Sequence, residues 1–180
     1  MLMIKSSEFL KHREKDYNEP ELNLLKELND VGAEFLIYEH PPLRTVEEWK
    51  TLRGKINGGH TKNLFLRDKK KNNYLVTAIE NQEVDLKNLA SFLSTSRLSF
   101  GSPDRLNQYL GVKPGAVSPL ALINDKKNEV VFYIDQNLLK QEILNFHPLI
   151  NTLTISLKVS DFRKYLLQIK HTFQEIDFNL

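Results

Sequence analysis

The sequence contains no cysteine, which excludes a disulfide framework, a thiol nucleophile and a thiolate metal site. It also lacks any apolar run near the roughly 20 residues that a membrane-spanning helix needs. The first ten residues include Lys5 and Glu8 and lack the continuous apolar stretch of a secretory signal. We therefore expect a cytoplasmic protein with no membrane partner.

The sequence also lacks a large excess of positive or negative charge. The formal net charge is +2 and the pI is about 8.7, far from the strongly basic balance of proteins that charge alone holds on nucleic acid. Any RNA contact is therefore expected to be local. The densest basic stretch runs from Arg67 to Lys71 and is followed by two asparagines, a pattern typical of a hairpin turn. Such a turn is either a solvated tip or a basic rim that meets phosphates.

Four catalytic or phosphate-binding motifs are absent: the G-x-S-x-G elbow, the P-loop, a G-x-G-x-x-G after a strand, and the H-E-x-x-H zinc pair. Each absence removes support for a large enzyme class. The histidines lack the spacing of metal ligands, so we expect no metal and no cofactor. They are His12, His40, His60, His147 and His171.

The composition that is present belongs to a globular protein. Hydrophobic residues make up 41% and charged residues 27% of the 180 positions. A chain of this length matches one domain, and no linker, composition shift or internal repeat marks a second. We expect a folded domain over 20–180, preceded by an extension over 1–19 that is either helical or a frayed arm.

Hydrophobic periodicity and the positions of glycine and proline predict an α+β fold. A helix over 20–31 ends at Gly32, and two strands over 62–68 and 73–79 form a hairpin around the basic turn. Further helices are predicted over 84–93, 102–110 and 160–169, with a short one starting at Thr45. Further strands are predicted over 34–38, 98–100, 120–123, 130–134, 152–157 and 173–178.

Three features are candidates for chemistry. Lys62 follows two glycines at the start of a predicted strand, so its ammonium is either a solvated charge or one presented to a cleft. The loop from Gly111 to Pro119 has four Gly or Pro positions in nine. At Gly115 this loop either turns the chain or leaves amide N–H groups for an oxyanion. His147, just before a proline, is either a structural residue or part of a site.

The order of these features resembles the YbaK-type aminoacyl-tRNA deacylases, which include the editing domain inserted in bacterial prolyl-tRNA synthetase. Five separated blocks in one order are much more specific than any single motif, and they span about 22–167. The resembling blocks are His40-Pro41-Pro42 with Thr45-Val46-Glu47-Glu48, Gly59 to Leu66, Leu98-Ser99-Phe100, Gly115 to Pro119, and Phe146-His147-Pro148 with Asn151-Thr152.

The resemblance implies a central mixed, largely antiparallel sheet flanked by helices, and an enzyme that hydrolyses the ester joining a wrong amino acid to tRNA. In that family the lysine matching Lys62 is closely tied to activity, and the loop matching Gly115 to Pro119 is the characteristic G-x-x-x-P element. Asn63 beside the lysine resembles the free-standing branch that removes alanine from proline tRNA. The implied partners are the acceptor end of mischarged tRNA and prolyl-tRNA synthetase.

Ester hydrolysis needs a site for the tetrahedral oxyanion, a positioned water and a proton for the leaving hydroxyl. We expect the amides of Gly115 and Ala116 to bind the oxyanion, and the Lys62 ammonium to hold the terminal nucleotide or its phosphate. No Ser/His/Asp or Cys/His set is apparent, so we expect the free ribose hydroxyl of the substrate to activate water. The expected substrate-binding residues are Thr45, Asn63, Ser118, Pro119 and His147, and the expected tRNA contacts are Arg67, Lys69, Lys70 and Lys71.

Three other functions stay open at this point. A non-catalytic RNA-binding module would use the basic turn and the aromatic residues Phe65, Tyr74 and Phe100 to hold a single-stranded end. A regulator of the same fold would have lost activity, although Lys62 and Gly115 are intact. A general hydrolase would cleave simple esters without tRNA.

Overall fold

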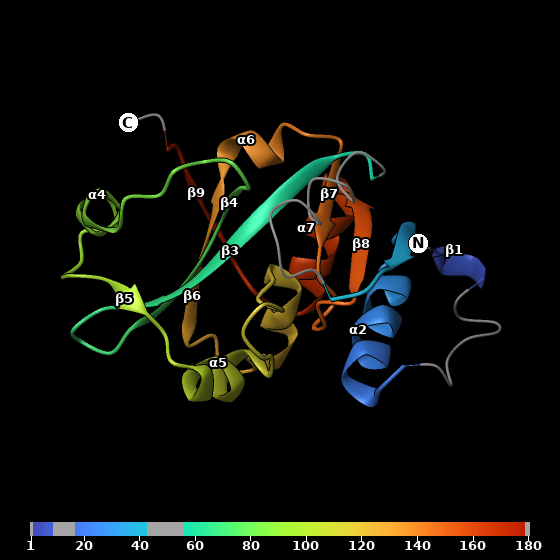
Figure 1. The fold of residues 1–180 in the computed structure, drawn as a ribbon, viewed down its shortest axis with the longest axis horizontal. Helices are drawn as coiled ribbons and strands as arrows, with labels where there is room; N and C mark the ends of the chain where they lie inside the picture. The colour runs from blue at the N-terminus through green and yellow to red at the C-terminus, as the bar shows by residue number, and fades with distance from the viewer. Residues whose placement is uncertain (1, 9–16, 43–55, 179–180) are drawn as a thin grey trace.

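The computed structural model describes residues 2–8, 17–42 and 56–178, and a long twisted sheet runs through all three segments (Figure 1). The spatial order of the strands is β1-β2-β8-β7-β3-β4-β6-β9, with β5 paired to β3. The strands are β1 (Leu2–Lys5), β2 (Phe35–Glu39), β3 (Gly59–Arg67), β4 (Asn73–Ile79), β5 (Ser99–Phe100), β6 (Val130–Asp135), β7 (Ile143–Phe146), β8 (Leu153–Lys158) and β9 (Gln174–Ile176).

Helices flank this sheet. They are α2 (Glu19–Asp30), α4 (Leu86–Phe92), α5 (Pro103–Leu110), the 3-10 helix η2 (Pro119–Asn124), α6 (Gln136–Leu139) and α7 (Val159–Gln168). The pairings β3-β7, β4-β6 and β6-β9 are parallel and the other pairings in the described residues are antiparallel. The α+β prediction, with a mixed and largely antiparallel sheet, is therefore confirmed.

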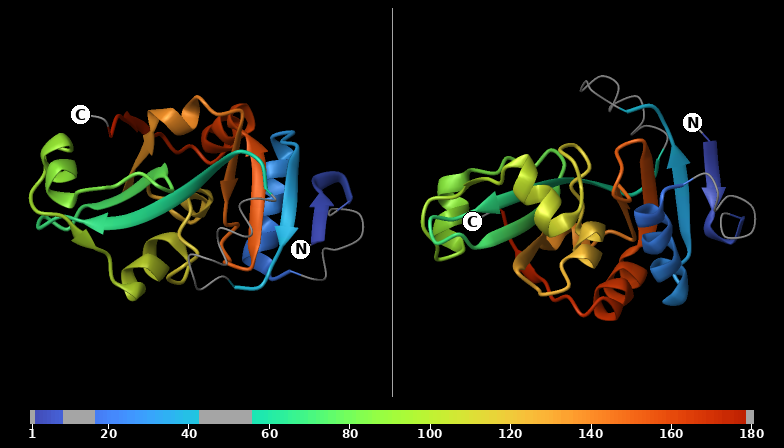
Figure 2. Two further views of the ribbon diagram at one scale, coloured as in Figure 1. Left: turned by 45° about the horizontal axis from the view of Figure 1, so that its top comes forward. Right: turned by 90° about the horizontal axis from the view of Figure 1, so that it is seen from below.

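Two hydrophobic clusters lie along the sheet. The larger includes Leu24, Leu25 and Leu28 of α2 together with Phe162 and Tyr165 of α7, all fully or almost fully buried. The smaller cluster joins α4 to the far part of the β3-β4 hairpin. Both views in Figure 2 place α4, β5 and the hairpin turn at one end of the molecule and α2 and β2 at the other. The long strand β3 connects the two ends.

The predicted hairpin is confirmed, and its turn is tightly organised by Asp68. This carboxylate is only 5% exposed. It accepts hydrogen bonds from Asn72 N (2.9 Å), Asn72 Nδ2 (2.9 Å), Tyr74 Oη (3.1 Å) and Thr95 Oγ1 (2.7 Å). Burial alone would raise the pKa of Asp68, but the hydrogen bonds from Thr95, Asn72 and Tyr74 outweigh it and lower that pKa to about 2. The turn is therefore built around a buried negative charge.

Two expectations from the sequence are wrong. The predicted strand over 120–123 is part of η2, because Pro119 occupies the first turn and Ser118 Oγ accepts a hydrogen bond from Leu120 N (3.2 Å). The strand β7 was not expected, since Ile143–Phe146 is short and has no regular alternation. The helix expected to start at Thr45 lies outside the described residues.

The N-terminal segment also differs from the expected helix or frayed arm. Leu2–Lys5 forms β1, which pairs antiparallel with β2, while 6–8 are helical. Ile4 is 5% exposed and belongs to the larger cluster. Within the described residues, the structure contains no helix long and apolar enough to cross a membrane.

Candidate active site

A small polar hollow lies where β3 leaves β7. The parallel pairing of these strands is short, with Gly59 opposite Leu144 and His60 opposite Asn145, and the hollow opens beside it. Its volume is about 30 Å³, room for about one or two groups of the size of water. The lining residues are His60, Thr61, Asn63, Glu80, Asn145, Phe146, His147 and Thr154. Segments more than 80 residues apart in sequence therefore meet here.

Asn63 is held by its neighbours in a fixed orientation. Thr77 lies opposite it in the β3-β4 register, is fully buried, and donates from Oγ1 to Asn63 Oδ1 at 2.7 Å. The carbonyl end of the amide is therefore engaged inside the sheet. The Nδ2 end lies 3.5 Å from Thr61 Oγ1, which itself donates to the main-chain oxygen of Asn145 at 3.0 Å. These contacts hold both ends of the Asn63 amide, and both Asn63 and Thr61 line the hollow.

The rings of His147 and His40 lie close together, with centroids 6.1 Å apart. His147 Nδ1 lies 2.7 Å from the carbonyl oxygen of Leu153, so Nδ1 carries the proton and Nε2 is the acceptor of the neutral ring. Burial is the main reason that the pKa of His147 is lowered, and the neighbouring His40 lowers it further. Burial also lowers the pKa of His40. The hollow therefore contains a neutral imidazole with a defined tautomer near neutral pH.

Lys62 points away from the hollow. Successive side chains of a strand lie on opposite faces of the sheet, so Lys62 and Asn63 are separated although they are adjacent in sequence. The Lys62 ammonium donates to the main-chain oxygen of Gln82, between β4 and α4. Burial lowers the pKa of Lys62, and the charge of nearby Glu83 partly opposes this effect. Lys62 does not line the hollow.

The glycine loop approaches the segment that follows His147. Gly115 is exposed and has φ of +90°, a conformation that favours glycine, and a Cβ placed there would lie 3.5 Å from Asn151 Nδ2. The amide of Ala116 donates to Lys113 O at 3.0 Å and is therefore engaged within the turn. In the part of the chain that the structure describes, the Gly115 amide has no such acceptor.

The structure thus brings together only some of the expected site residues. Asn63 and His147 line one hollow, whereas Lys62 lies on the other face of β3. Ser118 and Pro119 are buried at the start of η2, where they stabilise that helix. Thr45 lies outside the described residues. The turn with Arg67, Lys69, Lys70 and Lys71 lies at the opposite end of β3.

Sequence reasoning missed several polar residues of the hollow. Thr61 could have been found, since it lies two residues before Asn63 and so on the same face of the strand. Asn145 and Thr154 could not, because they reach the hollow from β7 and β8 through pairings that no local signal marks. The expectation that Phe65, Tyr74 and Phe100 could all hold a single-stranded end is also corrected. Phe65 and Tyr74 are only 4% and 7% exposed, so of these three rings only Phe100, which is 65% exposed, is accessible for stacking.

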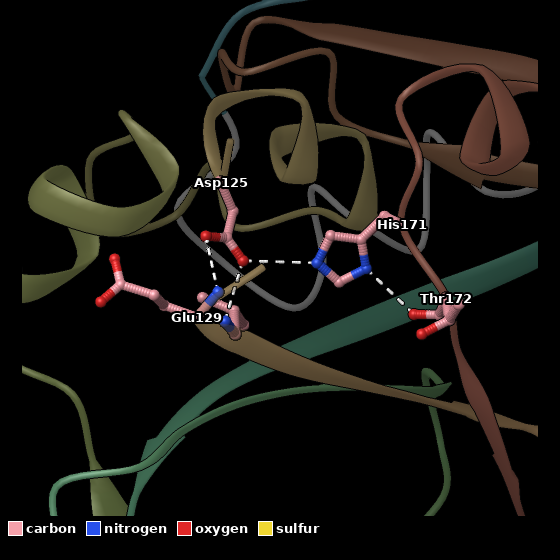
Figure 3. Close-up of polar contacts among 5 residues, drawn as sticks. Asp125, Glu129, His171 and Thr172 are labelled. Atoms are coloured by element: carbon pink, nitrogen blue, oxygen red, sulfur yellow. Dashed lines mark hydrogen bonds and ion pairs between the residues drawn. The ribbon is translucent and has the colours of Figure 1, made fainter. Parts of the chain in front are cut away.

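Another buried histidine, His171, lies outside the hollow and contacts a carboxylate (Figure 3). His171 Nε2 lies 3.3 Å from Asp125 Oδ2, and Asp125 also accepts hydrogen bonds from Glu129 N (2.9 Å) and Val130 N (2.8 Å). His171 Nδ1 lies 2.9 Å from Thr172 O. These contacts join the chain after α7 to the turn before β6. Within the described residues, no group of three or more His, Cys, Asp or Glu side chains is arranged to hold a metal ion.

Comparison with known proteins decides the family. Residues 40–165 match the sequence profile of the aminoacyl-tRNA editing domain. The chain belongs to this editing family. The protein is therefore an enzyme of the aminoacyl-tRNA deacylase class, which acts on mischarged tRNA as the sequence predicts.

Individual relatives of this editing domain are similar over most of the chain. The prolyl-tRNA editing protein ProX of Acetoanaerobium sticklandii is 36% identical over 155 residues, covering 86% of this chain and 94% of that protein. The prolyl-tRNA synthetase associated domain-containing protein 1 of Bos taurus is 36% identical over 140 residues, covering 75% and 81%. A solved structure assigned as a candidate trans-editing enzyme for prolyl tRNA synthetase has a TM-score of 0.65 at 16% identity, covering 89% and 98%. That last likeness shows a shared fold.

Proposed function

We propose that this deacylase acts in trans on proline tRNA that carries alanine, and that the hollow beside β7 receives the aminoacyl group. The observation that carries the proposal is the meeting of Asn63 and His147 in one small polar hollow. The names of the relatives support the choice of tRNA, since ProX is a prolyl-tRNA editing protein. Prolyl-tRNA synthetase is the expected partner, and the cytoplasm, where tRNA is charged, is the expected compartment.

The size of the hollow supports a small amino acid. The small volume of the hollow, about 30 Å³, favours the methyl group of alanine over the larger proline ring. An active site that selects by hydrophobic contact separates side chains differing by a methylene by only about 10- to 200-fold, so a synthetase that admits alanine needs a second site that selects by exclusion. The deacylase would supply that second site.

The reaction adds water across the ester. The water oxygen attacks the carbonyl carbon, the ester C–O bond to the ribose breaks, and the ribose oxygen leaves as a hydroxyl while alanine leaves as the free acid. We assign the activation of water to the adjacent free ribose hydroxyl, because it can pass a proton between the attacking and leaving oxygens. The Gly115 amide is the proposed donor to the oxyanion, and Ala116, whose amide is engaged with Lys113 O, is not retained in that role.

The side chains of the hollow have separate proposed roles. The Asn63 amide nitrogen donates to the aminoacyl or ribose oxygen, and Nε2 of neutral His147 accepts from the α-amino group or a ribose hydroxyl. Lys62, on the other face of β3, holds a phosphate of the terminal nucleotides as an ammonium. Ser118 and Pro119 act indirectly by fixing the start of η2.

The test is a panel of mischarged tRNAs incubated with the purified protein, with loss of each ester followed over time. We expect alanine to be removed from proline tRNA while proline on the same tRNA persists. Lys62→Ala should lower the rate strongly, whereas Lys26→Ala, an exposed lysine of α2, should leave it unchanged. Equal removal of proline and alanine, or a Lys62→Ala protein as active as the parent, would overturn the proposal.

A further inference from the structure

Two basic segments that are far apart in the sequence are held together at the end of the molecule occupied by α4 and β5 (Figures 1 and 2). The first is the β3-β4 turn, and the second runs from α4 to β5 and includes Lys87 in α4 and Arg97 after it. Asp68 of the turn accepts from Thr95 Oγ1 at 2.7 Å, and the amide of Lys69 donates to Ser96 Oγ at 3.1 Å. These contacts fix the turn against the second segment.

The joined segments carry five cationic side chains, which we call the basic tip: Lys69, Lys70, Lys71, Lys87 and Arg97. All five are exposed. Lys87 and Arg97 line a second hollow, of about 590 Å³, which is separate from the one beside β7. Thr95, which contacts Asp68, also lines it. Glu83 and Asp85, acidic neighbours in the sequence, line a different hollow. The turn lysines are joined to this hollow by the contact between Lys69 N and Ser96 Oγ, and the cations gather there although the net charge of the chain is only +2.

An exposed aromatic ring accompanies these cations. Phe100 is 65% exposed and lies opposite buried Leu66 in the β3-β5 register, three residues after Arg97. The face of this ring is therefore accessible for stacking. Cations beside an accessible ring are typical of surfaces that bind nucleic acid, where phosphates meet Lys and Arg and bases stack on aromatic faces. An anionic lipid surface would also accept cations and an aromatic ring, and the vesicle arm of the experiment separates the two.

The spacing between the basic tip and the hollow fits one extended ligand. Asn63 and Arg67, at the end of β3 next to the turn, are four positions apart, which corresponds to about 13 Å at the rise of a strand. This length corresponds to a few nucleotides of backbone rather than to a single aminoacyl group. A ligand that filled the hollow and reached the basic tip would therefore be a polynucleotide.

We propose that the basic tip, including Lys87, Arg97 and Phe100, binds the phosphate backbone and an unpaired base near the acceptor end of the tRNA while the aminoacyl group occupies the hollow. The inference rests on the proposed function. It keeps three of the turn residues expected from the sequence, Lys69, Lys70 and Lys71, and adds a second segment. Asp68 acts as a positioning residue, because it holds the two segments in one surface.

The experiment compares two double charge reversals of equal size. Lys87→Glu with Arg97→Glu alters the basic tip, and Lys26→Glu with Lys158→Glu alters exposed lysines of α2 and β8. Binding of uncharged proline tRNA is measured as a function of salt, and deacylation is measured on whole mischarged tRNA and on an alanyl ester of adenosine. Anionic phospholipid vesicles form a further arm.

We expect the tip variant to bind tRNA on the order of ten-fold more weakly at low salt, with the salt slope reduced by about two, because each lost phosphate contact removes about one unit. Its kcat/KM should fall on whole tRNA and stay unchanged on the short ester, and Phe100→Ser should weaken tRNA binding by a few-fold. Equal tRNA affinities for the two double variants, or a tip that binds vesicles and not tRNA, would overturn the inference.

The two proposals can fail separately. If the protein binds tRNA through the basic tip but removes alanine from neither substrate, the proposed function fails while the binding surface stands. If it hydrolyses the short ester and whole tRNA equally well in both double variants, the function stands and the surface fails.

Discussion

The hollow beside β7 and the contact between Asp125 and His171 both bury a histidine with hydrogen-bonding partners, yet the two regions are built differently. In the hollow, His147 Nδ1 contacts the carbonyl oxygen of Leu153, and Asn63 Oδ1 accepts from Thr77. Both residues line a cavity. At Asp125, both carboxylate oxygens are occupied by main-chain amides, and one of them also faces His171.

We interpret this difference as one between the proposed binding region and a structural one. A polar group that is satisfied on all sides contributes to stability and has no capacity left for a ligand. A polar group held at one end, with the other end directed into a cavity, is oriented for a ligand. Mutations should therefore separate the two regions: changes at Asp125 should affect the free energy of unfolding, and changes in the hollow should affect catalysis.

Removal of the Asp125 carboxylate should have the largest effect. Asp125→Ala leaves two main-chain amides and the His171 ring without their acceptor inside the protein. We expect a loss of about 3–5 kcal/mol in the free energy of unfolding, measured by urea denaturation. Asp125→Asn, which keeps an acceptor oxygen, should lose less. Folded Asp125→Asn should keep the parental kcat. An Asp125→Ala protein as stable as the parent would contradict the structural role of Asp125.

Truncation of Asn63 should act in the opposite way. Asn63→Ala removes the amide donor on the side of the hollow, and we expect deacylation to fall by about 100-fold, the scale of losing one positioned donor. The melting temperature should change little. Asn63→Asp is the matched variant, since it keeps the oxygen that accepts from Thr77 and loses the donor. Activity of Asn63→Asp near that of the parent would exclude the proposed role of the amide nitrogen.

The sequence predicted the helices and most strands well, because their signals are local. Pro103 and Ser102 mark the start of α5, and Gly111 in the left-handed conformation marks its end. The wrong strand over 120–123 has a local cause too: apolar residues favoured a strand, but the Ser118 cap and Pro119 favoured a 3-10 helix. In such a short apolar run, periodicity does not separate the two.

The site was less predictable, because long-range pairing decides it. Asn63 and His147 were expected together, and they do line one hollow. The position of Lys62 on the opposite face follows from strand alternation and could have been expected once 62–68 was taken as a strand. The contribution of Asn145 could not have been expected from the sequence. It depends on the parallel pairing of β3 with β7, which the sequence did not indicate.

Thr77 offers a finer test of the hollow, with a smaller expected effect. Thr77→Val keeps the shape of the side chain and removes the donor to Asn63 Oδ1, so the Asn63 amide loses its fixed orientation. We expect deacylation to fall by about ten-fold, the equivalent of one neutral hydrogen bond. Thr77→Ser, which restores the hydroxyl, should recover most of the rate. If Ser and Val variants are equally slow, the effect of Thr77 comes from packing and not from orientation.

The smallest expected effect is a decrease in the rate of deacylation at acidic pH. Burial places the pKa of His147 and of His40 below the ordinary value of 6.5. A depressed pKa in the folded state means that the associated stability is present above about pH 6.5 and is lost as pH falls through the folded values. Deacylation should stay level down to about pH 6.5 and decline by a few-fold only at lower pH, because the lowered pKa of His147 delays the change of Nε2 from acceptor to donor.

The pH profile can be assigned to the hollow by comparing two variants. His147→Gln keeps hydrogen-bonding capacity but does not titrate in this range. We expect this variant to be slower than the parent, and its rate to depend less on pH. His171→Gln removes a buried histidine from the structural contact and should leave the shape of the rate profile unchanged, although the protein should be less stable. An acidic decline that disappears in the His171 variant instead would place the titration in the structural region and reverse the assignment.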